Sequence, residues 1–147
     1  MRNVLIDTSI YIDFFRHGLQ KGSFLERVLG DYSYAIHLSS VVAQELYAGA
    51  AEPAAAAQLD RLFHSFEGPG RIVTPSRSDW FECGRILFKL GEKHGFESIK
   101  RGRLVNDVLI ALSCRLVDAS LITNNLKDFR MIGEFVDLDI YTSPLDL

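Results

Sequence analysis

The sequence predicts an α/β protein: a three-layer α/β/α sandwich around a mostly parallel sheet of about five strands. Three observations predict this fold. Short apolar runs alternate with segments of helical periodicity, as in parallel sheets that helices cover on both faces. The 147 residues are enough for one domain, so we expect a single unit over 1–147. Apolar residues make up 48% and charged residues 24%, as in ordinary globular domains.

The first half of the chain alternates two strands with helices. Its predicted elements are strand 3–6, helix 8–17, a helical face at 24–29, strand 34–38, helix 40–50 and helix 53–66. Gly18 and Gly30 end the first two helices. Ser39 or Ser40 caps the third, and Pro53 at a first-turn position begins the fourth.

The second half continues the same alternation. Its predicted elements are turn 68–70, strand 71–74, helix 78–94, loop 95–103, helix 105–116, strand 119–123, a short turn at 126–129 and strand 138–141. Ser78 followed by Asp79 and Glu82 is typical of a helix start. Together the two halves predict the five strands of one sheet.

Acidic and amide side chains lie where a parallel sheet of this kind binds ligands, beyond the carboxyl ends of its strands. Asp7 directly follows the first strand, and Glu45 lies in the helix after the second. Asp107 lies near the beginning of the helix before the fourth strand, and Asn125 and Asp128 follow that strand. Four separate segments therefore bring acids or amides to one end of one sheet.

Each acid also has a purely structural explanation. Asp7 can cap the following helix, although Thr8 and Ser9 also supply capping groups there. Asp107 can complement the dipole of its helix, and Asp128 can be a surface acid in a turn. These explanations account for the acids one at a time, but not for their convergence.

Converging carboxylates need a counter-ion. At an effective dielectric constant near 20, two carboxylates ~5 Å apart repel by about 3 kcal/mol. No Lys or Arg adjoins Asp7, Glu45 or Asp107 in the sequence, and His and Cys show no metal-ligand spacing. Oxygen ligands of this kind favour Mg²⁺ or Mn²⁺ over zinc. We therefore expect these three acids to bind a divalent metal, which suits the hydrolysis of a phosphodiester.

Four short motifs follow one another along the chain: Ile6-Asp7-Thr8-Ser9, Gln44-Glu45-Leu46, Asn106–Ala111 and Thr123–Phe129. In this order they resemble the PIN domain and, more narrowly, the VapC toxins of bacterial and archaeal toxin–antitoxin pairs. The resemblance covers essentially the whole chain. It implies a Mg²⁺- or Mn²⁺-dependent endoribonuclease whose acids match Asp7, Glu45 and Asp107.

The resemblance also implies supporting residues and partners. Thr8 or Ser9, and Thr123, resemble hydroxyls that support the site of the family, and each is equally well a cap. Many PIN domains carry a fourth acid where this sequence has Asn125, so we expect Asn125 and Asp128 to assist. The implied partners are an RNA substrate, a second copy of the chain, and an antitoxin that places a basic residue in the acidic site.

A basic segment precedes the third acid. Lys100, Arg101 and Arg103 are expected to hold RNA phosphates beside Asp107, although a solvated charged face also explains them. The aromatic residues lie mostly at core spacing and predict no platform for stacking bases. An apolar excess in the first helices, which includes Phe14, indicates a partner surface if the core does not absorb it.

The cysteines and the apolar runs indicate in which cellular compartment the protein acts. Cys83 and Cys114 predict two buried thiols in a reducing cytoplasm rather than a disulfide. The apolar runs are far shorter than the ~20 residues that cross a bilayer. Asp7 follows the amino terminus too closely for a signal peptide, so we expect a cytoplasmic protein without a membrane partner.

Two competing functions remain open from the sequence. The first is a PIN-like module that binds RNA or protein without cutting, with Asn125 as the mark of a decayed site. The second is a phosphatase that uses Asp7 as its nucleophile, which is disfavoured because Ser9 stands where a second acid would be needed.

Overall fold

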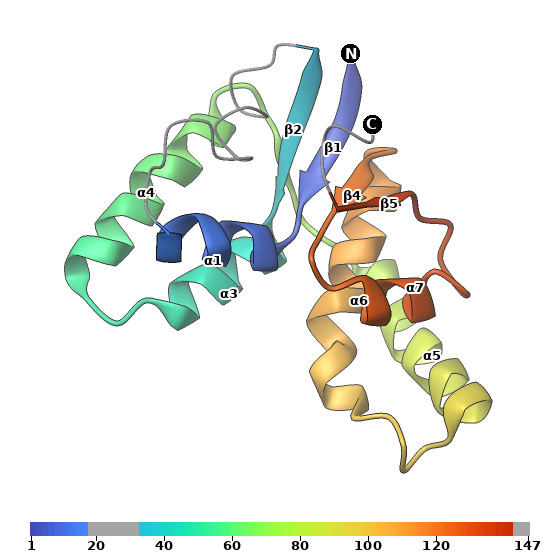
Figure 1. Cartoon of the computed structure of the whole chain (residues 1–147). Helices are drawn as coiled ribbons and strands as arrows, with labels where there is room; N and C mark the ends of the chain where they lie inside the picture. Colours follow the sequence, from blue (N-terminus) through green and yellow to red (C-terminus); the bar gives the residue numbers. More distant parts are fainter. Residues whose placement is uncertain (18–32, 143–147) are drawn as a thin grey trace.

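The computed structural model describes residues 1–17 and 33–142, and within them it contains one sheet of five parallel strands. The strand order is β3-β2-β1-β4-β5, which confirms the predicted α/β class (Figure 1). The strands are β1 (Arg2–Ile6), β2 (Tyr34–Ser39), β3 (Ile72–Val73), β4 (Ser120–Ile122) and β5 (Ile140–Tyr141).

Six helices accompany the sheet in the described part of the chain: α1 (Thr8–His17), α3 (Ser40–Gly49), α4 (Pro53–Glu67), α5 (Arg77–His94), α6 (Arg101–Leu116) and α7 (Leu126–Ile132). Figure 1 shows α1, α3 and α4 grouped to one side of β1 and β2, and α5, α6 and α7 grouped to the other. The helical face predicted at 24–29 lies outside the described residues.

Several predicted boundaries are wrong, and three of them matter most. Helix α6 begins at Arg101, within the loop predicted at 95–103. This start was not predicted because no side chain caps the helix and the sequence therefore carries no start signal. The turn predicted at 126–129 is the short helix α7, which Phe129 and Ile132 anchor in the core. The last strand is shorter than the predicted 138–141, with only two residues in the ladder.

Strand β1 lies between β2 and β4, and its register fixes where the following residues emerge. Val4 lies opposite Ile36 of β2, and Ile6 lies opposite Ile122 of β4. The amide of Asp7 continues the ladder by donating to the Ile122 carbonyl oxygen at 2.9 Å. The residues after β1 and after β4 therefore leave the sheet side by side.

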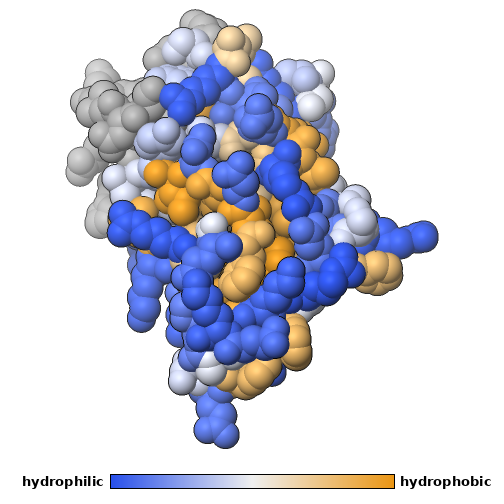
Figure 2. All heavy atoms as spheres, turned by 90° about the vertical axis from the view of Figure 1, so that its right-hand side faces the viewer, coloured by the Kyte–Doolittle hydropathy of each residue, from blue (hydrophilic) through white to orange (hydrophobic). Residues whose placement is uncertain are grey.

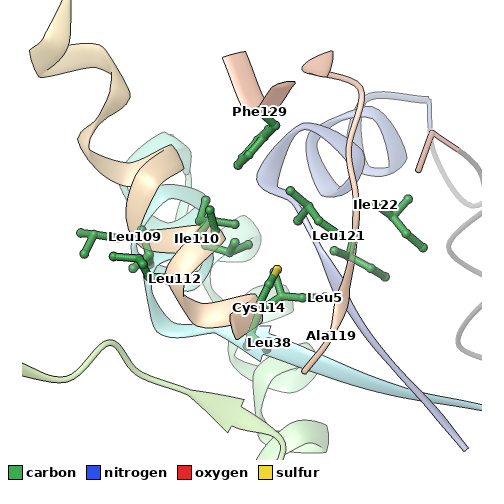
Figure 3. Packing of buried hydrophobic residues seen from close by; sticks show 14 of the residues in the cluster. Leu5, Leu38, Leu109, Ile110, Leu112, Cys114, Ala119, Leu121, Ile122 and Phe129 are labelled. Atoms are coloured by element: carbon green, nitrogen blue, oxygen red, sulfur yellow. The ribbon is translucent and has the colours of Figure 1, made fainter. Parts of the chain in front are cut away.

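The core packs the sheet against α6 and α7. Leu5, Leu109, Leu121 and Phe129 are all fully buried within it (Figure 3). Helix α6 is buried on nearly every side, since each residue from 108 to 114 is inaccessible or almost so. This burial explains the uninterrupted apolar run that follows Asp107 in the sequence.

Both cysteines are free and buried, as predicted. Among the described helices, none combines the length and the apolar composition that crossing a bilayer would require.

An ionic cluster joins α5 to the end of α6. The Arg115 guanidinium donates to Asp79 Oδ1 at 3.3 Å and to both carboxylate oxygens of Glu82. Burial alone would raise the pKa of Asp79, but hydrogen bonds from Ser76 and Arg115 outweigh it and lower that pKa. The hydrogen bond from Arg115 is the main cause of the lowered pKa of Glu82. Both acids are thus held in their charged form.

We expect Arg115→Gln to lower the free energy of unfolding by about 1–2 kcal/mol at pH 7, because charge-assisted hydrogen bonds are lost around the buried Asp79. Since the folded-state pKa values of both acids are depressed, this stabilisation is present above their unfolded pKa values and is lost as the pH falls through the folded ones. Urea unfolding at pH 7 and at pH 3 measures the effect. A variant whose deficit is as large at pH 3 contradicts this assignment.

Candidate active site

Asp7 lies at the carboxyl end of β1 and is only 4% exposed. Its Oδ2 accepts hydrogen bonds from Ser9 Oγ and from Thr123 Oγ1, each at 2.7 Å. Thr123 directly follows β4, so this carboxylate joins the ends of two neighbouring strands. Its hydrogen-bonding partners are thus hydroxyl groups rather than the backbone amides of α1, and capping does not explain the acid.

Glu45 lies in the middle of α3 and is half-buried. Its Oε1 accepts a hydrogen bond of 2.7 Å from Thr8 Oγ1 at the beginning of α1. The hydroxyls of Thr8 and Ser9, which the sequence allowed to be helix caps, instead donate to carboxylates from different elements. Each fixes the orientation of one acid.

Asp107, Asn125 and Asp128 form the other part of the site. The Asn125 side chain lies between the two acids, with its Nδ2 at 3.3 Å from Asp107 Oδ2 and 3.2 Å from Asp128 Oδ2. Asp107 lies in the second turn of α6, whose first turn contains no acid, so complementing the helix dipole does not explain it. Asp128 is half-buried rather than a surface acid.

The electrostatics show that the acids lie close together. Burial, together with the negative charges of Asp7, Glu45 and Asp128, raises the pKa of Asp107 to about 7, while the charge of Arg103 acts in the opposite direction. Within residues 1–17 and 33–142, none of these acids forms an ion pair with Lys or Arg. The site therefore has an excess of negative charge.

The donor set suits a hard divalent cation, because it offers carboxylate and amide oxygens without His or Cys. The side chains as they stand do not form a closed ligand cage: no group of three or more His, Cys, Asp or Glu residues is arranged to hold a metal in the described part of the chain. One oxygen of each acid is instead bound to a hydroxyl or an amide. Hence the chemistry of the donors fits a metal, and metal binding by Asp7, Glu45 and Asp107 stays a prediction.

The basic segment is not a loop. Lys100 is the N-cap residue of α6, and Arg101 and Arg103 lie exposed in its first turn. The Arg101 guanidinium lies 4.9 Å from the centre of the Phe96 ring. Of these three cations, Arg103 is the one whose charge lowers the pKa of Asp107.

The model of the PIN domain family matches residues 4–134, which include every acid of this site. The chain belongs to the PIN domain family. A search of curated proteins gives no match.

Solved structures similar to this PIN domain belong to complexes named VapBC. One is VapBC2 from Rickettsia felis bound to a DNA fragment from their promoter, at 24% identity and a TM-score of 0.67, covering 95% of this chain and 97% of that chain. Another is VapBC-1 from nontypeable Haemophilus influenzae, at 21% identity and a TM-score of 0.65, covering 95% and 96%. DNA-bound VapBC from Salmonella typhimurium matches at 20% identity and a TM-score of 0.67, covering 96% and 98%. At these identities the similarity shows a shared fold.

Two surface features of the PIN domain are only partly predictable from the sequence. A hollow of about 410 Å³ lies between α1, α3 and α4, with Ile12, Phe15 and Leu59 among its apolar walls and Glu45 at its edge. The apolar excess in the first helices indicated a partner surface. The shape of the hollow could not be predicted, because it depends on how the three helices pack against one another.

The second feature is an aromatic face on α5. Trp80, Phe81 and Phe88 are each more than half exposed, at 55%, 63% and 53%. Figure 2, which looks onto the side of the molecule that carries α5, α6 and α7, shows apolar side chains exposed among hydrophilic ones. The expectation that aromatic residues serve mostly the core is therefore wrong for α5, because periodicity does not show which apolar side of a helix is covered.

Proposed function

We propose that this PIN domain is a metal-dependent endoribonuclease and the VapC-type toxin of a toxin–antitoxin pair. One observation carries the proposal. Asp7, Glu45, Asp107 and Asp128 lie close together, and burial and the charges of the other three acids raise the pKa of Asp107 to about 7. None of these acids forms an ion pair with Lys or Arg in the described residues. Such a cluster is suited to a divalent cation and a phosphodiester substrate.

The residues divide into ligands and supports. Asp7, Glu45 and Asp107 would hold Mg²⁺ or Mn²⁺, which when bound supplies charge stabilisation for phosphodiester hydrolysis. Thr123 and Ser9 orient Asp7, and their hydroxyls keep its buried carboxylate hydrogen-bonded before a metal arrives. Thr8 orients Glu45 in the same way, because its hydroxyl donates to Glu45 Oε1. The protein would act in the cytoplasm, where its RNA substrate is found.

The basic start of α6 would bind the RNA backbone. Arg103 lies near Asp107 and can hold a phosphate beside the acids. Lys100 and Arg101 extend the positive charge along the same end of the helix, with Arg101 resting on Phe96. This arrangement supports RNA binding without base-specific contacts.

Cleavage of a labelled single-stranded RNA tests the proposal. We expect cleavage with Mn²⁺ or Mg²⁺ and its loss in excess EDTA, with activity restored when the metal is added back. Calorimetric titration with Mn²⁺ separates the nuclease from a silent PIN-like binding module, which should bind no metal at this site. Cleavage that continues unchanged in excess chelator would count against the proposal.

An antitoxin segment would occupy the hollow between α1, α3 and α4. Its walls are mainly apolar, and the carboxylate of Glu45 lies at its edge, so the complementary occupant is an apolar peptide that carries a basic side chain. The similar solved structures named VapBC support such a partner. A short reading frame for a DNA-binding protein beside the gene would support this pairing, and its absence would oppose it.

A second copy would pack against the aromatic face of α5. Gly84 lies between Phe81 and Phe88, and a Cβ there would meet no atom within 4 Å, so a partner helix can approach closely. If two α5 helices cross antiparallel between Gly84 and Arg85, Phe81 of one copy lies level with Phe88 of the other. Arg77 then lies level with Glu92 of the other copy, which pairs a positive with a negative charge at each end of the contact.

We expect the chain to sediment as a dimer and Phe81→Ser with Phe88→Ser to shift it to a monomer, because the apolar contact is lost. Sedimentation velocity measures the shift. Leu116→Ser, at an exposed position near the end of α6, is the control and should remain dimeric. A wild-type chain that sediments as a monomer, or a double variant that stays dimeric, contradicts this interface.

A further inference from the structure

Asn125 is the N-cap residue of α7, yet its side chain does not cap the helix. Asn at this position usually accepts a hydrogen bond from a backbone amide in the first turn. Here the side chain points instead to the two acids on either side of it, Asp107 and Asp128. The side-chain amide of Asn125 therefore has a role other than capping α7.

The partners of Asn125 decide which end of its amide faces the acids. Both contacts are carboxylate oxygens, and in the structure each accepts a hydrogen bond from Nδ2. The amide nitrogen, which carries two hydrogens, is therefore the end that lies between Asp107 Oδ2 and Asp128 Oδ2, at 3.3 Å and 3.2 Å. A metal ligand would have to present the amide oxygen instead.

We propose that Asn125 is a positioning residue that holds Asp107 and Asp128 at a fixed separation by donating to both, and that it does not ligate the metal. The inference rests on the proposed function of this site. The two acids come from different helices, α6 and α7, and like charges on separate elements move apart unless a donor lies between them.

The backbone of Asn125 extends this role to the third acid. Its amide donates to Thr123 Oγ1 at 2.9 Å, and that hydroxyl in turn donates to Asp7 Oδ2 at 2.7 Å. One residue thus connects three carboxylates from three elements. The backbone contact survives substitution of the side chain, so a variant at 125 removes only the link between Asp107 and Asp128.

The first arm of the test is steady-state RNA cleavage with saturating Mn²⁺. We expect Asn125→Ala to lower kcat at least about tenfold with KM within about threefold, as when a group that orients a ligand is lost. Asn125→Asp should lose at least as much, because a carboxylate cannot donate to its two neighbours. A ligand role predicts the reverse, since Asp is the stronger ligand, so an Asn125→Asp variant as active as wild type overturns the proposal.

The matched control is Asn124→Ala, the same change at the neighbouring position of the same loop. Asn124 Nδ2 donates to Asp13 Oδ2 on α1 at 2.9 Å, and its side chain forms no contact with the three acids in the described part of the chain. We expect kcat and KM to stay within about twofold of wild type. Equal losses at 124 and 125 would mean that both act only by shaping the loop.

The second arm is urea unfolding without metal, which is independent of any nuclease activity. Asn125→Ala should lower the urea midpoint, and the fall should be smaller in an Asp128→Asn background, where one of the two repelling charges is gone. Equal falls in both backgrounds overturn the proposal. If Asn125→Ala does not fold, Asn125→Ser, which keeps a donor, replaces it and should show a smaller fall than Asn125→Asp.

The two arms separate this inference from the proposed function. If wild type cuts no RNA but the unfolding results hold, the nuclease proposal fails and the positioning role stands. If wild type cuts RNA while the variants at 125 behave like Asn124→Ala, the positioning role fails alone.

Discussion

We expect Asp7→Asn to lower RNA cleavage by about 10²–10³-fold while the chain stays folded. The acid is buried at the junction of β1 and β4, and the variant removes the charge that a divalent cation would need there. The fold survives because the Asn carbonyl oxygen can still accept hydrogen bonds from the hydroxyls of Ser9 and Thr123. Initial cleavage rates with Mn²⁺ and far-UV circular dichroism measure the two expectations.

Asp137→Asn is the matched control for this variant. Asp137 is exposed and lies beside the segment that leads into β4. It is therefore at the opposite end of β4 from Asp7, whose amide donates to the Ile122 carbonyl oxygen. The control should cut RNA at the wild-type rate. A folded Asp7→Asn variant with full activity would remove Asp7 from the reaction and with it the proposed metal site.

Leu109→Ala has the largest expected effect on stability, a loss of about 3–5 kcal/mol in the free energy of unfolding. Leu109 is fully buried in α6 and belongs to the hydrophobic core (Figure 3). A loss of this size is a large part of the 5–15 kcal/mol that stabilises a typical domain. Urea unfolding followed by circular dichroism gives the value.

Leu116→Ala provides a comparison on the same helix. Leu116 lies two turns later and is 47% exposed, so the same substitution should change the free energy of unfolding by only about 0.5 kcal/mol. Equal losses of unfolding free energy in the two variants would contradict the burial of Leu109 in the core.

The fold was predictable because its strands are buried. Apolar runs such as 4–6 show no alternation of apolar and polar residues, which is typical of strands buried on both faces of a parallel sheet. The start of α6 was not predictable, because Lys100 offers no capping side chain and Gly102 weakens the helical signal. Local sequence thus predicts elements well where burial is complete and poorly where a helix starts without a cap.

The acids of the site were predictable from strand ends, but their hydrogen-bonding partners were not. Asp7 and Thr123 are 116 positions apart, and only the parallel pairing of β1 with β4 brings them together. Likewise the sequence shows an amide at Asn125 without showing which way it faces. Hydrogen bonds between distant segments depend on register, which the residue pattern alone does not determine.

The central place of β1 has a consequence for biosynthesis. Strand β1 is synthesised more than a hundred residues before β4, so one of its two edges stays unpaired until β4 follows. Until then Asp7 lacks the Thr123 hydroxyl, and the constellation of acids does not exist. If the proposed function is correct, RNA cleavage therefore cannot begin until β4 has been synthesised and has paired with β1.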